Sequence, residues 1–146
     1  MTSCLWPFNQ TEKLSQPGSE GPNFPYSEIG NRYFPLVDIA IHSNFRIFKV
    51  RALVDSGASL SLFRPELATY LGLKIEKGRR IVLESITTQI TGYIHELHAE
   101  ITGKKFKLPI AFLATPHTSF NILGREGFFN QFIITFNEDK KILKLK

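Results

Sequence analysis

Two runs in which apolar residues alternate with other residues, at positions 34–42 and 46–54, constrain the fold of this chain more than any other feature. A period of two is that of a β-strand, in which successive side chains point to opposite faces. Ser43 and Asn44 separate the runs and favour a turn, so we predict a β-hairpin. The second run leads directly into Asp55, which we therefore expect where a strand becomes a loop.

The rest of the chain also favours strands. The sequence has 146 residues, of which 42% are hydrophobic, with 13 Phe, 10 Gly and 8 Pro. This composition favours one mostly β domain with a proper core. Arg64-Pro65-Glu66 and a following apolar face predict one short helix. Further strands are expected at residues 81–83, 93–101 and 106–113, with a terminal hairpin at 132–136 and 142–145.

The domain boundary is expected between residues 33 and 34. Residues 7–32 carry several Pro and Gly among polar residues and show no sustained period. We therefore predict a flexible N-terminal segment at residues 1–33 and a folded domain at residues 34–146. The apolar side of the terminal hairpin is expected either at a subunit interface, which we favour, or against the core of the same chain.

The sequence argues against a disulfide, a metal site and a membrane span. The single cysteine, Cys4, cannot form an internal disulfide or build a zinc site, so we expect a reducing, cytoplasmic location. No apolar run reaches the length of a membrane span. His95 and His98 are three residues apart, and on a strand this spacing places them on opposite faces, which argues against a metal pair.

The acidic loop carries the strongest chemical signal. Asp55 follows three apolar residues and precedes Ser56, Gly57 and Ala58. Apolar walls raise the pKa of a carboxylate, whereas the N–H groups of a tight loop stabilise its ionised form, so such a setting can tune the pKa in either direction. Gly57 permits a tight turn, and the Ser56 hydroxyl can brace it. Asp-Ser-Gly alone is also ordinary turn sequence.

Two blocks resemble one family. Residues 53–58 resemble the Asp-Thr/Ser-Gly-Ala signature of retropepsins, the retroviral-type aspartic proteases. Ile122, Leu123, Gly124 and Arg125 are similar to the family's apolar-apolar-Gly-Arg segment, which in that fold packs beside the catalytic loop and opens a short helix. The resemblance implies a single-lobe, closed β-barrel with one or two short helices that functions as a homodimer.

The resemblance also implies a mechanism. Because the chain contains one Asp-Ser-Gly, a second catalytic carboxylate has to come from another copy of the chain. Two Asp55 carboxylates would share one proton and activate a water that attacks a peptide bond. The implied protein is an aspartic endopeptidase acting on a peptide or protein, without metal or cofactor.

A substrate-binding flap is expected by position, between the strands at 81–83 and 93–101. Retroviral relatives usually have a glycine-rich flap tip, which this chain lacks. It also departs from them at two other positions. Retroviral members often have Asp at the position of Ser59, and Asp or Asn is commoner at the position of Glu126. The residues assigned to the flap are Ile86, Thr87, Thr88 and Gln89.

Two other classes of function stay open. A retropepsin-like homodimer that has lost catalysis could serve as a binding scaffold. A basic nucleic-acid-binding module is a further alternative, given a formal net charge of +5. It is less favoured because several basic residues alternate with apolar ones, as on the solvent face of a strand. These residues include Lys77, Arg79, Arg80, Lys104, Lys105, Lys107, Lys140, Lys141, Lys144 and Lys146.

Overall fold

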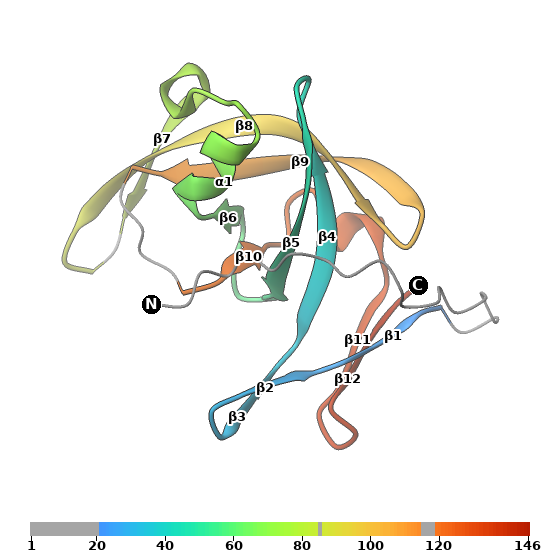
Figure 1. Ribbon diagram of the computed structural model, residues 1–146. Helices are drawn as coiled ribbons and strands as arrows, with labels where there is room; N and C mark the ends of the chain where they lie inside the picture. Colours follow the sequence, from blue (N-terminus) through green and yellow to red (C-terminus); the bar gives the residue numbers. More distant parts are fainter. Residues whose placement is uncertain (1–20, 85, 115–118) are drawn as a thin grey trace.

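The computed structural model describes residues 21–84, 86–114 and 119–146, which form a mostly β fold with one short α-helix (Figure 1). The predicted fold class is confirmed. The elements in chain order are β1 (Asn23–Pro25), β2 (Ser27–Ile29), β3 (Arg32–Phe34), β4 (Leu36–His42), β5 (Ile47–Val54), β6 (Ser61–Phe63), α1 (Pro65–Tyr70), η1 (Ile75–Lys77), β7 (Arg79–Glu84), β8 (Gln89–Ile101), β9 (Lys104–Leu113), β10 (Asn121–Leu123), η2 (Phe129–Gln131), β11 (Ile134–Asn137) and β12 (Ile142–Leu145).

The main sheet closes into a barrel. Its strand order is β4-β5-β10-β6-β9-β8-β7, and β8 also pairs with β4. The predicted hairpin is β4–β5, with Leu36 opposite Leu53 at one end and His42 opposite Ile47 at the other. The ring is completed where β4 meets β8, from Ala40 to His42. β7 lies outside this ring as the partner of β8.

Alternate residues of the strands fill the barrel. Val37, Ile39 and Ile41 of β4 are almost fully buried, as their two-residue period predicts. Helix α1 has proline at its N-terminal end, where a missing N–H costs nothing, and buries Leu67 and Ala68 against this core. Each large side chain buried in this way contributes about 1.5–3 kcal/mol of transfer free energy.

The C-terminal hairpin belongs to a second sheet, of order β1-β12-β11. Leu143 and Leu145 of β12 are buried and join the barrel core. The interface position that we favoured for the apolar side of this hairpin is therefore wrong for these two residues, because the same chain covers them. Phe129, Phe132, Ile134 and Phe136 also pack against this core, so the hairpin helps to complete the core of its own chain.

Strands β1 to β3 lie in the segment expected to be flexible. β1 pairs antiparallel with β12, with Phe24 opposite Leu143, and β2 pairs with β3 as a sheet of its own. Part of residues 1–33 is thus ordered by pairing with the far end of the chain. Residues 1–20 lie outside the described residues, and the domain boundary itself stays a prediction.

Candidate active site

Asp55 stands immediately after β5, at the head of a tight loop. Its backbone N–H donates to the Leu123 carbonyl at 3.1 Å, and its carbonyl accepts from the Ala58 N–H at 3.2 Å. The Gly57 N–H donates to Asp55 Oδ1 at 2.9 Å. Asp55 and Ala58 are half-buried, while Ser56 and Gly57 are exposed. The loop therefore fixes the carboxylate by its own backbone and still leaves it accessible.

The second motif lies beside this loop. β10 runs between β5 and β6, with Ile122 opposite both Leu53 and Leu62. Beyond β10, the Arg125 N–H donates to the Ala58 carbonyl at 2.9 Å. The two blocks singled out in the sequence are thus neighbours in space. The Arg125 side chain is exposed, and the expected short helix is a turn followed by the 3-10 helix η2.

Gly124 allows the two segments to approach. A Cβ at this position would lie 2.3 Å from the Leu60 carbonyl oxygen, a distance that no side chain tolerates. The Gly124 N–H donates to the Ser61 hydroxyl at 3.0 Å, and Ser61 is completely buried. The missing side chain of Gly124 and the buried Ser61 hydroxyl therefore allow the segment after β10 to pack closely against the backbone at Leu60.

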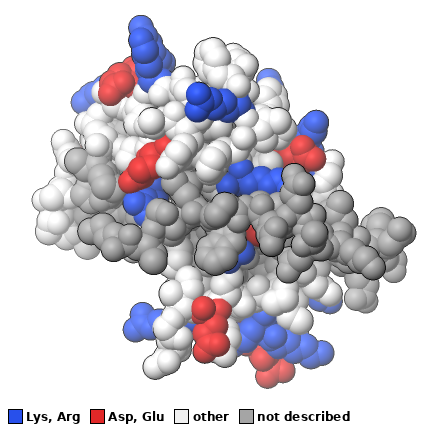
Figure 2. Space-filling view, in the orientation of Figure 1, with Lys and Arg blue, Asp and Glu red and all other residues white. Residues whose placement is uncertain are grey.

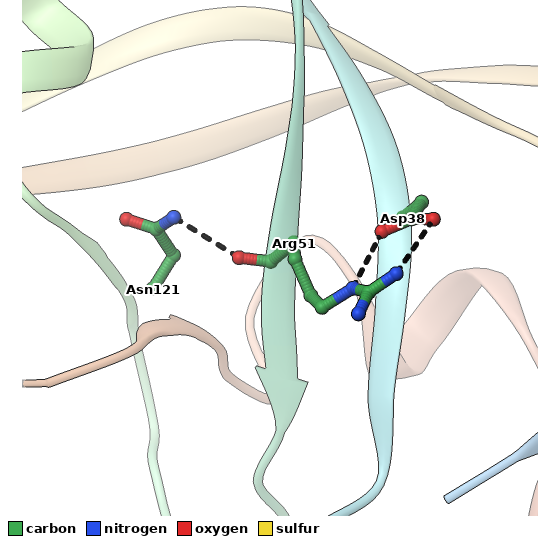
Figure 3. A network of polar contacts seen from close by, with 3 residues as sticks. All are labelled: Asp38, Arg51 and Asn121. Atoms are coloured by element: carbon green, nitrogen blue, oxygen red, sulfur yellow. Dashed lines mark hydrogen bonds and ion pairs between the residues drawn. The ribbon is translucent and has the colours of Figure 1, made fainter. Parts of the chain in front are cut away.

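Asn121 anchors the other end of β10 (Figure 3). The residue is 2% exposed, and its side-chain amide accepts from the Arg64 N–H at 3.0 Å and donates to the Arg51 carbonyl at 3.1 Å. The Arg51 guanidinium in turn binds both carboxylate oxygens of Asp38, at 2.9 and 3.3 Å, and these hydrogen bonds raise its pKa further. One side chain thus connects β10, β5 and the start of α1.

Sequence reasoning missed Ser61 and Asn121. A polar residue directly before the apolar-apolar-Gly block was the available signal for Asn121, because a strand between two others has little room for an unpaired amide. No comparable signal marks Ser61, whose strand is only three residues long.

An apolar row runs across the barrel on the same side as Asp55. Side chains two residues apart share a face of a strand, so Leu53 faces the same way as Asp55. The cross-strand partners continue the row from β5 to β8. Its members are Leu53, Ile122, Leu62, Ala111 and Ile94. None of them belongs to the main core cluster, and the first three are only half-buried.

The expected flap is the hairpin of β7 and β8. Glu84 pairs with Gln89, and residues 86–89 are exposed at its tip, where Ile86 has a relative exposure of 104%. Ser85 lies outside the described residues. From Gly92 onward β8 also pairs with β9, and the Ala114 N–H donates to the Thr91 carbonyl at 3.3 Å, so among the described residues the hairpin beyond Thr91 is held by the β7–β8 ladder. The structure therefore contains a projecting arm at this place.

The described part of the chain shows mixed charge on one face (Figure 2) and no side-chain cluster suited to a metal ion. On the face shown in Figure 2, Lys and Arg are interspersed with Asp and Glu. Within residues 21–84, 86–114 and 119–146, no three His, Cys, Asp or Glu side chains are grouped so as to hold a metal ion. No helix among these residues is long and apolar enough to span a membrane.

Comparison with known proteins identifies the class. Residues 45–126 match the aspartyl protease family, and the chain belongs to it. Asp55, Gly57 and Gly124 lie inside the matched region. None of the curated proteins matches the sequence significantly.

Solved structures identify the fold as retropepsin-like. A retropepsin-like aspartic protease from Rickettsia conorii is similar with a TM-score of 0.65 and 20% identity, over 90% of this chain and 96% of that chain. EIAV protease complexed with the inhibitor HBY-793 is similar with a TM-score of 0.50 and 16% identity, over 68% of this chain and 89% of that one. The family and fold that the two sequence blocks predicted are confirmed.

Proposed function

We propose that the chain is an aspartic endopeptidase whose active site forms when two copies bring their Asp55 residues together. The observation that carries this proposal is the Asp55 loop, in which the Gly57 N–H fixes one carboxylate oxygen while the side chain stays accessible. The match to the aspartyl protease family over residues 45–126 supports it. One chain supplies one such loop, so catalysis requires a partner.

The chemistry follows from the pairing. Two carboxylates about 3 Å apart cannot both ionise easily, so the dyad holds one proton. The ionised Asp55 takes a proton from a water that attacks the peptide carbonyl, and the protonated one donates a hydrogen bond to the developing oxyanion. Proton transfer to the leaving nitrogen completes the cleavage. The chain's backbone hydrogen bonds at Asp55, Ala58 and Arg125 keep the geometry fixed during these steps.

Substrate binding is assigned to the apolar row and the β7–β8 hairpin. Leu53, Leu62 and Ile122 lie on the same side of the barrel as Asp55 and are only half-buried, so they can receive apolar side chains of an extended peptide. Residues 86–89 would close over the peptide as a flap. The exposed Ile86 then gains an apolar contact that the free protein lacks.

Digestion of an unbiased peptide library tests the catalytic assignment. Asp55→Asn should abolish cleavage, and pepstatin, a transition-state mimic, should inhibit the wild type. Asp139→Asn is the matched control, because it removes the same charge from an exposed turn between β11 and β12. Cleavage that persists in Asp55→Asn would contradict the assignment.

Mixing two variants tests the intersubunit dyad. Wild-type chains equilibrated with a ninefold excess of Asp55→Asn chains should lose most of their activity, because only about one tenth of them then meet another wild-type chain. The same excess of Asp139→Asn chains, which keep Asp55, should instead raise the total activity about tenfold, because every pair then carries two Asp55 residues. Undiminished activity with Asp55→Asn would place the whole site in one chain.

The library experiment also separates the alternative function. A catalytically silent homodimeric scaffold would bind library peptides and dimerise, yet it would cleave none of them under any condition. Nucleic-acid binding would instead appear as affinity for RNA or DNA that falls steeply with salt.

A further inference from the structure

We propose that the β2–β3 hairpin, residues 27–34, is an arm that packs against a second copy of this chain. This inference rests on the proposed Asp55 dyad, and it assigns the surface that assembles it. The hairpin lies outside residues 45–126, the region that matches the aspartyl protease family.

The hairpin is a sheet of its own. Ser27 pairs with Phe34 and Ile29 with Arg32 around a tight turn at Gly30, and within the described residues neither strand pairs with any other. A two-stranded hairpin is marginally stable in water by itself. Free strand edges are also ready templates for another chain. Both properties favour a partner.

The tip of the hairpin exposes apolar groups on both faces. Ile29 and Tyr33 have relative exposures of 47% and 49%. The register places Ile29 on the face of Ser27 and Phe34, and Tyr33 on the opposite face with Glu28. Neither side of the tip is therefore covered by its own barrel.

The base of the hairpin is fixed, so the arm is not a frayed terminus. Tyr26 is buried, its N–H donates to the Lys141 carbonyl, and its hydroxyl donates to Glu138 Oε1 at 2.8 Å. On the other strand, the Phe34 ring lies 5.1 Å from that of Phe120. The hairpin is held at its base and projects only at its tip.

Its position selects a second copy as the partner. The Val54 N–H donates to the Pro35 carbonyl at 3.0 Å, so the hairpin leaves the barrel beside the residue that precedes Asp55. Figure 1 shows the β2–β3 and β11–β12 hairpins extending from this same end. A twofold axis between two Asp55 residues brings the partner to this end, and three strand residues reach about 10 Å toward it. Glu28 and Arg32, both exposed, give the arm charges of both signs for self-pairing.

Sedimentation tests the arm in an Asp55→Asn background, so that the readout does not depend on activity. Ile29→Asp combined with Tyr33→Asp should weaken dimerisation at least about tenfold. The control is Phe45→Asp with Ile47→Asp, two residues exposed by 72% and 63% at the opposite end of β5. The control should dimerise like its parent. Thermal unfolding verifies that each variant is folded, and Ile29→Ser with Tyr33→Ser replaces the arm variant if it is not.

The outcomes separate the two proposals. A dimer as tight in the arm variant as in its parent overturns the arm and leaves the Asp55 dyad standing. Equal weakening in the control also overturns it, because the effect would then not be local to the hairpin. A parent that stays monomeric at every concentration overturns the dimeric active site, and the arm falls with it.

Discussion

The backbone N–H of Arg125 donates to the carbonyl of Ala58 at 2.9 Å, and this bond joins the two sequence blocks at the active-site loop. The neighbouring Glu126 N–H repeats the contact at the Ser59 carbonyl, also at 2.9 Å. The loop that carries Asp55 is thus held from outside by a segment distant in the sequence. Its geometry depends on how closely the two backbones approach.

Gly124→Ala should disrupt this approach. The added Cβ would meet the Leu60 backbone at 2.3 Å, so we expect a loss of about 3 kcal/mol or more in the free energy of unfolding. Gly103→Ala is the control: Gly103 has a φ of +81° but no heavy atom within 4 Å of the added Cβ. Its cost should be about 1–2 kcal/mol, from backbone strain alone. Urea unfolding measures both, and equal losses would refute the close-approach argument.

Asn121→Ala should loosen β10. The substitution removes a buried amide that bonds the Arg64 N–H and the Arg51 carbonyl, and we expect a loss of about 1–3 kcal/mol in the free energy of unfolding. Asn44→Ala, at an exposed turn, should change stability little. Asn121→Asp keeps the acceptor but loses the donor and buries a charge. Its stability should therefore recover as the pH falls and the carboxyl is protonated.

Tyr26 should make the fold sensitive to alkali. Burial, together with the hydrogen bond to Glu138 and the charge of that residue, raises the pKa of Tyr26 to about 12. Because the folded state holds this proton more tightly than the unfolded state, stability is fully present below about pH 10 and is lost as the pH rises toward 12. Urea unfolding between pH 9 and pH 12 should show a steeper fall for the wild type than for Tyr26→Phe. Parallel curves would contradict the assigned cause.

Ile86→Gln should affect substrate binding and leave stability unchanged. The Ile86 side chain is fully exposed in the free chain, so its replacement removes no internal contact. If it covers bound peptide, KM should rise about tenfold, as expected for one lost apolar contact. Ile47→Gln, at the exposed first residue of β5, should leave KM unchanged. An unchanged KM in Ile86→Gln would remove that residue from the flap.

The predicted elements are those whose pattern is local. The β4–β5 hairpin follows from its two-residue period, and Asp55 falls at the strand end as that period requires. β8 begins at Gln89, earlier than the expected residue 93, because the polar outer part of the hairpin shows no alternation. The barrel and the contact between the two blocks came from the family resemblance, since a sequence alone does not show which strands pair.

The elements that were missed depend on distant partners. β1 contains Pro25 and lacks alternation, and it becomes a strand because β12 offers it a paired edge. Ser61 and Asn121 received no role from the sequence, yet each is buried and hydrogen-bonded to backbone that the sequence does not place nearby. Local propensity cannot indicate such partners.

The barrel closes where β4 meets β8, over Ala40–His42 only, at the end of β4 remote from Asp55. This seam is three residue pairs long, whereas β4 and β5 share seven, so its amides should exchange with solvent sooner than those of the β4–β5 ladder. The barrel wall can open transiently at this β4–β8 seam while the loop around the Asp55 carboxylate keeps its shape. Local opening is therefore expected at one end of the β4–β5 hairpin, and the fixed geometry of Asp55 lies at the other end.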